Sequence, residues 1–75
     1  MKHTVMGINE GDDFASYENV LAIKSEELAV LMGWKDQEDY VYDYQLTKDQ
    51  ITAIEQACSV SFPSDLILFL TTSQN

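Results

Sequence analysis

The chain has 75 residues, a length that fits one domain spanning residues 1–75. It carries 13 acidic and 4 basic residues, for a formal net charge of −9, and its 45% hydrophobic content is too high for a disordered acidic tail. No apolar run approaches the roughly 20 residues of a membrane span. The only strong cations are four lysines, too few to neutralise nucleic-acid phosphates. We therefore expect an acidic domain that contacts neither membrane nor nucleic acid directly.

The cysteine content predicts a reducing compartment. Cys58 is the only cysteine, so it has no partner within the chain for a disulfide. The first residues, MKHTVM, lack the apolar core of a secretory signal. We expect a cytoplasmic protein, with a monomer favoured.

The first third of the chain favours a β-hairpin. Residues 4–8 (TVMGI) form a β-like run, residues 9–13 (NEGDD) are turn formers, and a second apolar run covers residues 20–23. A helix over residues 16–32 is the competing interpretation, because apolar residues there also follow a rough helical stripe.

A short helix is predicted to begin at Ser25. The serine is a suitable N-cap, and Glu26 and Glu27 would lie at the positive end of the helix dipole. Gly33 is the expected C-terminal stop. Residues 34–46 are predicted to be a strand or an extended loop, with Tyr40, Tyr42, Tyr44 and Leu46 alternating onto one side.

Two further helices are predicted. Thr47 and Gln50 match a capping box, and apolar residues at helical spacing continue the helix from residue 48 to 58. Pro63 is placed to open a last helix, with residues 66–70 buried on every side and residues 71–75 frayed. The predicted fold class is a small α+β domain, an N-terminal β-hairpin or sheet packed with two to three short helices. The predicted core contains Val5, Ile8, Leu21, Ile23, Leu28, Leu31, Ile51, Ile54, Cys58, Leu66, Phe69 and Leu70.

The sequence offers little for catalysis or metal binding. His3 and Cys58 are the only soft metal ligands, whereas a zinc site needs three or four. A Ser-His-Asp arrangement would depend on His3, which we expect at a mobile terminus. Carboxylate pairs such as Asp12/Asp13 lack a deep cleft in so small a chain. We therefore predict no catalytic residue, no metal and no cofactor.

The segment 34–44 is the most informative feature, because it combines carboxylates with aromatic residues. Trp and Tyr dominate binding hot spots, and neighbouring carboxylates speed encounter with a basic partner. The alternative is that the aromatic side chains face the core and the acids are merely solvated. The predicted partner-binding residues are Trp34, Asp36, Glu38, Asp39, Tyr40, Tyr42, Asp43 and Tyr44, with Glu10, Asp12 and Asp13 as a secondary cluster.

Three segments carry a family resemblance: SEELAVLMGW at 25–34, DYVYDYQLTKDQ at 39–50 and FPSDLILFL at 62–70. Together they resemble small bacterial immunity proteins that accompany contact-dependent growth-inhibition or bacteriocin toxins. The resemblance implies a protein that binds a basic toxin domain, often a tRNase or DNase, and blocks its active site or a nearby surface. The chain does not resemble the four-helix immunity proteins of DNase colicins, because its first third favours strands.

Two other functions are compatible with the composition. A phage-type inhibitor would use its acidity to mimic nucleic acid and occupy a host nucleic-acid enzyme. A regulatory or scaffold subunit would use its acidity for solubility alone and bind through an apolar patch in a salt-insensitive way.

Overall fold

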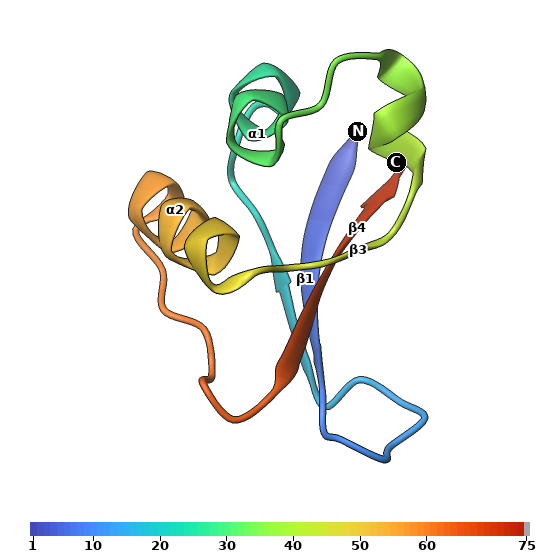
Figure 1. The fold of residues 1–75 in the computed structure, drawn as a ribbon, viewed down its shortest axis with the longest axis vertical. Helices are drawn as coiled ribbons and strands as arrows, with labels where there is room; N and C mark the ends of the chain where they lie inside the picture. Colours follow the sequence, from blue (N-terminus) through green and yellow to red (C-terminus); the bar gives the residue numbers. More distant parts are fainter. Residues whose placement is uncertain (75) are drawn as a thin grey trace.

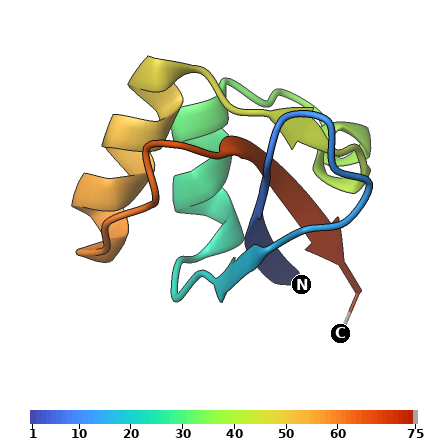
Figure 2. The same cartoon turned by 90° about the horizontal axis from the view of Figure 1, so that it is seen from below.

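The computed structural model describes residues 1–74 and consists of a four-stranded sheet with two helices packed on one face (Figure 1). All strand pairs are antiparallel, in the order β2-β1-β4-β3. Figure 2 shows both helices on the same side of the sheet. The predicted α+β class is confirmed. The elements are β1 (Lys2–Ile8), β2 (Tyr17–Val20), α1 (Ser25–Met32), the 3-10 helix η1 (Gln37–Val41), β3 (Tyr44–Gln45), α2 (Lys48–Cys58) and β4 (Ile67–Ser73).

The N-terminal hairpin is confirmed, with its second strand earlier than predicted. β2 pairs with β1 from Gly7↔Tyr17 to Thr4↔Val20, so the competing helix over residues 16–32 is wrong. Side chains in β2 alternate between half-buried and exposed, which is the period of a strand. Beyond β2, the Leu21 N–H still donates to the His3 carbonyl at 2.8 Å, and its side chain turns into the core.

The predicted C-terminal helix is wrong, because residues 67–73 form β4 at the centre of the sheet. β4 pairs with β1 over its whole length, from Lys2↔Ser73 to Ile8↔Ile67. An apolar run of this length fits a buried strand as well as a helix, and the β-branched residues in it favour a strand. Residues 71–73 are therefore ordered in the sheet, while the last predicted residue of the frayed tail, 75, lies outside the described part.

The helix ends follow local capping rules with one exception. In α2 the Thr47 hydroxyl accepts from the Gln50 N–H at 3.2 Å, and the Gln50 side chain accepts from the Thr47 N–H at 2.9 Å, as the capping box predicts. Gly33 ends α1 in the left-handed conformation with φ 72°, also as predicted. Ser25 is not the N-cap, because Lys24 holds that position and the Ser25 hydroxyl bonds to His3 instead.

The core lies between the helices and one face of the sheet. Five of the predicted core residues are buried there and five more pack partly buried against them. Ile8 and Phe69 were wrongly predicted, because the strand alternation points them to the opposite face of the sheet. The buried apolar side chains are Val5, Leu21, Leu28, Leu46, Ile54, Phe62, Leu68 and Leu70.

Candidate protein-binding surface

Residues 34–44 form a loop, the 3-10 helix η1 and the start of β3, so the predicted extended conformation holds only near Tyr44. The Asp39 carboxylate is the local cause. Its Oδ2 atom accepts from the backbone N–H groups of Lys35 at 3.0 Å and Asp36 at 3.3 Å, and the Asp39 N–H donates back to the Asp36 carbonyl at 3.0 Å. These bonds close a turn that an extended strand would lack.

Three of the predicted binding residues form an aromatic cluster with one another. The Trp34 ring centroid lies 4.9 Å from that of Tyr40 and 5.5 Å from that of Tyr44. All three side chains are half-buried. The Tyr44 hydroxyl donates to the Asp39 carbonyl at 2.7 Å, which ties the cluster to η1. Burial, followed by the charge of Asp39, raises the pKa of Tyr44, so the hydroxyl keeps its proton at neutral pH.

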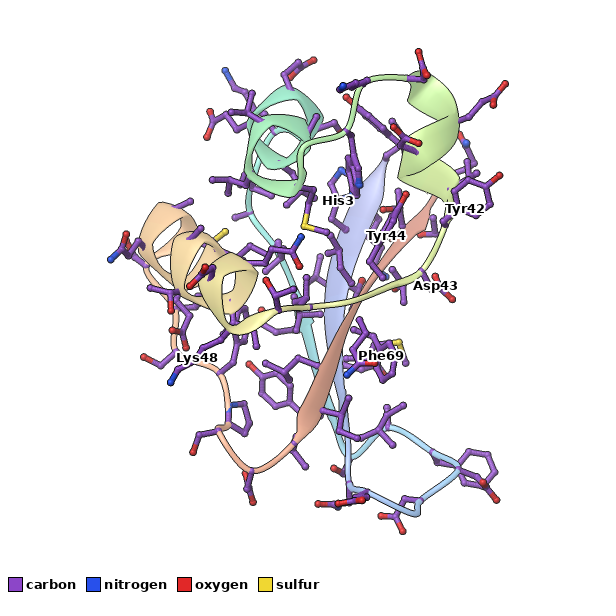
Figure 3. The ribbon with its side chains drawn as sticks, in the orientation of Figure 1. His3, Tyr42, Asp43, Tyr44, Lys48 and Phe69 are labelled. Atoms are coloured by element: carbon purple, nitrogen blue, oxygen red, sulfur yellow. The ribbon has the colours of Figure 1, made fainter. Side chains whose placement is uncertain are left out.

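The remaining members of the predicted set are exposed, apart from Asp39, which is half-buried. Tyr42 is 58% exposed, whereas Tyr44 is half-buried and Leu46 is buried, so the predicted placement of all these side chains on one side is wrong. Figure 3 shows Tyr42 and Asp43 on the side of β3 away from the helices. We call the exposed group the acidic edge; it consists of Asp36, Glu38, Tyr42 and Asp43.

The secondary acidic cluster lies elsewhere. Glu10, Asp12 and Asp13 are all exposed in the loop between β1 and β2, where the Asp12 N–H donates to the Asn9 carbonyl at 3.0 Å. Figure 1 places this loop and η1 at opposite ends of the molecule. The fold therefore does not join the two predicted acidic groups into one surface.

His3 is buried rather than mobile, which corrects the prediction for this residue. It is 2% exposed and faces the helices from β1. Its Nε2 lies 2.8 Å from the Ser25 hydroxyl and its Nδ1 lies 2.9 Å from the Thr72 hydroxyl. Burial, followed by the nearby N-terminal amine, lowers the pKa of His3, so the ring is neutral at pH 7. In a Ser-His-Asp triad the histidine Nδ1 bonds to a carboxylate, whereas here its partner is the Thr72 hydroxyl. The two contacts of His3 join β1 to β4 and α1.

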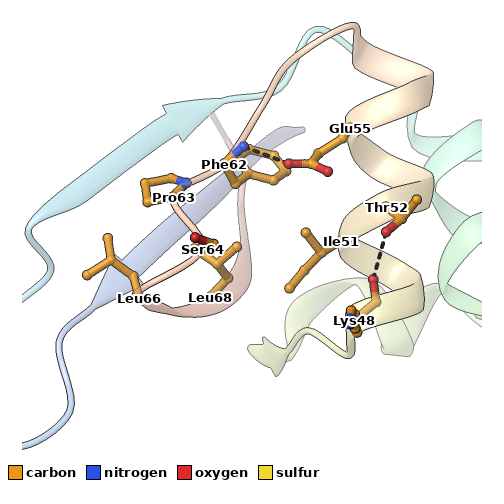
Figure 4. Close-up of a pocket in the computed structure, with 9 residues that line it drawn as sticks. All are labelled: Lys48, Ile51, Thr52, Glu55, Phe62, Pro63, Ser64, Leu66 and Leu68. Atoms are coloured by element: carbon orange, nitrogen blue, oxygen red, sulfur yellow. Dashed lines mark hydrogen bonds between the residues drawn. The ribbon is translucent and has the colours of Figure 1, made fainter.

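A pocket of about 470 Å³ lies between α2 and the segment leading into β4 (Figure 4). Its one carboxylate, Glu55, accepts from the Phe62 N–H at 2.8 Å. The Thr52 hydroxyl is likewise bonded to the Lys48 carbonyl at 3.1 Å. Both polar side chains are therefore engaged in hydrogen bonds within α2 and the loop that follows it.

The chain matches no known family, and its described residues hold no membrane helix or metal cluster. No family model matches the chain, and neither a curated protein nor a solved structure matches it. Within residues 1–74, no helix is long and apolar enough to cross a membrane. In the same range, no three His, Cys, Asp or Glu side chains gather in a way that could hold a metal ion.

Proposed function

We propose that this protein acts as an immunity-type inhibitor, which binds a basic toxin nuclease domain in the cytoplasm and blocks its active site or an adjacent surface. The observation that supports this function is the acidic edge held on a packed aromatic support. Asp36, Glu38 and Asp43 are exposed. The Asp39 carboxylate accepts from the backbone at Asp36, and the rings of Tyr40 and Tyr44 pack against Trp34.

The hydrogen-bonded support beneath the acidic edge matters for affinity. Ordering a loop on binding costs free energy, so a surface that is already ordered retains more of its interaction energy. In the acidic edge, the backbone conformation is held by the hydrogen bonds of Asp39 within residues 35–39. The aromatic cluster of Trp34, Tyr40 and Tyr44 packs beneath this surface. Tyr42 is then the aromatic side chain with the most exposed area for a partner, at 58%.

Charge supports the same class of partner. A net charge of −9 raises the encounter rate with a basic protein and opposes encounter with acidic ones. The active sites of nucleases must attract phosphates, so they carry basic clefts that an acidic protein can cover. Asp39 contributes charge to this steering, but its carboxylate oxygen is already engaged by backbone N–H groups.

The test begins with the gene immediately upstream of this one. If it encodes an exported protein with a basic C-terminal domain, that domain should bind this chain and lose its toxicity when the two are co-expressed. The Tyr42→Ala variant should protect less well than the Phe14→Ala variant, which removes an 83% exposed aromatic side chain from the distant β1–β2 loop. The proposal would be contradicted if the basic domain encoded upstream neither bound this chain nor lost its toxicity on co-expression. Binding to a host nucleic-acid enzyme instead would support the charge-mimic inhibitor.

A further inference from the structure

The sheet has a second face that no helix covers. Because α1 and α2 both pack on one side (Figures 1 and 2), most side chains that alternate to the other side reach solvent, although Thr4 among them is only 8% exposed. Val20 is 54% exposed there and Ile67 is 36% exposed. We call this surface the open face; its apolar residues are Met6, Ile8, Val20, Ile67 and Phe69.

The strand register brings four of these side chains together, while Val20 on β2 stands opposite Thr4. Met6 lies opposite Phe69, and Ile8 lies opposite Ile67 across the β1–β4 pair. A shallow hollow of about 270 Å³ is lined by Met6, Ile8, Phe69, Thr71 and Asp43. Contiguous apolar surface of this kind marks interaction sites in proteins.

Charge decides which kind of occupant fits. Asp43 lines the hollow, and Glu18 lies on the open face opposite Met6. The cationic side chain on this face is Lys2, which lies at the far end of β1. A second copy of this chain would bring the same carboxylates and another net charge of −9 against this face. A basic partner would instead pair its cations with Glu18 and Asp43.

Asp43 also makes the open face continuous with the acidic edge. Figure 3 shows Asp43 and Phe69 on the same side of the sheet, away from the helices. A partner attracted by the acidic edge would therefore have an apolar surface directly beside its ionic contacts. This arrangement is that of an interface with apolar contacts flanked by charge.

We infer that the open face is the apolar half of the partner-binding surface, and that it takes an apolar side chain of a basic protein whose lysine or arginine neighbours pair with Asp43 and Glu18. This inference rests on the proposed function and deepens it. It assigns the apolar contacts to β1, β2 and β4, where the pattern of the sequence had pointed to Trp34, Tyr40 and Tyr44.

The test uses two synthetic peptides and the isotope-labelled full chain, observed by nuclear magnetic resonance. One short peptide alternates leucine with lysine, and the other alternates serine with lysine. The leucine-lysine peptide should shift the methyl resonances of Met6, Ile8 and Val20, whereas the serine-lysine peptide should bind more weakly and shift the amides of Glu38 and Asp43. A matched pair of variants, Val20→Thr on the open face and Val30→Thr on α1, controls for the loss of an exposed methyl group.

Val20→Thr should weaken binding of the leucine-lysine peptide about fourfold, the effect of roughly one buried methyl group. Val30→Thr should leave that binding unchanged, although Val30 is 81% exposed. The open-face inference would be overturned if the leucine-lysine peptide shifted resonances only at the acidic edge or only in the helices. It would also be overturned if the wild type were a dimer that Val20→Thr dissociates. If the acidic edge responds to neither peptide while the open face responds, the proposed charge-steered function fails separately.

Discussion

The one-sided packing of the sheet predicts opposite results for one substitution made at two positions. Val5 and Val20 are both valines on paired strands, β1 and β2, and both would be changed to threonine. Val5 is 0% exposed and faces the helices, whereas Val20 is 54% exposed and lies on the open face. Because valine and threonine share their shape and their preference for strands, the pair isolates the effect of burial.

The structure sets the size of the difference. At Val5 the change removes one buried methyl group, about 0.8 kcal/mol, and buries a hydroxyl group, roughly 1–3 kcal/mol. We expect Val5→Thr to lower the free energy of unfolding by roughly 2–4 kcal/mol. A chain of this length has a total of only about 4–11 kcal/mol. At Val20 the hydroxyl meets water, so the expected change lies within about 0.5 kcal/mol.

Urea unfolding followed by Trp34 fluorescence and circular dichroism measures both variants against the wild type. An unchanged slope with urea concentration indicates that the midpoint shift reports stability. In thermal unfolding, Val5→Thr should lower the Tm by roughly 8 °C or more, since 1 kcal/mol corresponds to about 4–8 °C in a domain of this size. Equal losses at the two positions would refute one-sided packing of the sheet.

Three other predictions concern polar groups of the fold. Burial lowers the pKa of His3 below its ordinary value of 6.5, so the unfolded chain binds more protons than the folded one. As the pH falls below 6.5, the wild type should therefore lose more stability than His3→Gln, and equal pH slopes in urea unfolding would contradict this. Burial, followed by the charge of Glu27, raises the pKa of the Cys58 thiol. A disulfide reagent should therefore react slowly with the folded protein at neutral pH and faster in urea, and equal rates in the two conditions would exclude this protection. Asp39→Ala should lower the free energy of unfolding by about 1 kcal/mol more than Asp39→Asn, because asparagine keeps an acceptor for the turn. Urea unfolding followed by Trp34 fluorescence measures both variants, and equal losses would rule out a role of Asp39 in closing the turn.

Local signals in the sequence predicted elements whose ends are decided locally. The capping box of Thr47 and Gln50 and the stop at Gly33 were correct because each depends on nearby residues alone. β4 was missed because the length of an apolar run bounded by Pro63 fits a helix as well as a strand, and pairing with β1, more than 50 residues earlier, selects the strand. The burial of His3 likewise depends on partners from α1 and β4.

The predicted binding segment shows a similar limit. Its composition identified an acidic, aromatic stretch, and the structure divides that stretch into exposed carboxylates and a half-buried ring cluster. This division arises from the 3-10 turn closed by Asp39, which places Tyr40 and Tyr44 against Trp34 and leaves Tyr42 outside. The open face could not be predicted because residues such as Phe69 look like core until the position of the helices is known.

The most direct test of the charge-steered interaction is the association rate with the basic domain encoded upstream, measured at low and high salt. Two double variants should be compared: Glu38→Lys with Asp43→Lys at the acidic edge, and Asp49→Lys with Asp65→Lys at exposed positions outside it. Each reversal adds two charges, so both double variants move the net charge from −9 to −5. We predict that reversal at the acidic edge slows association by about tenfold or more and flattens its salt dependence, while the control pair has a much smaller effect. Equal slowing by the two pairs, or an association rate that does not respond to salt, would contradict the acidic edge as the partner-binding surface.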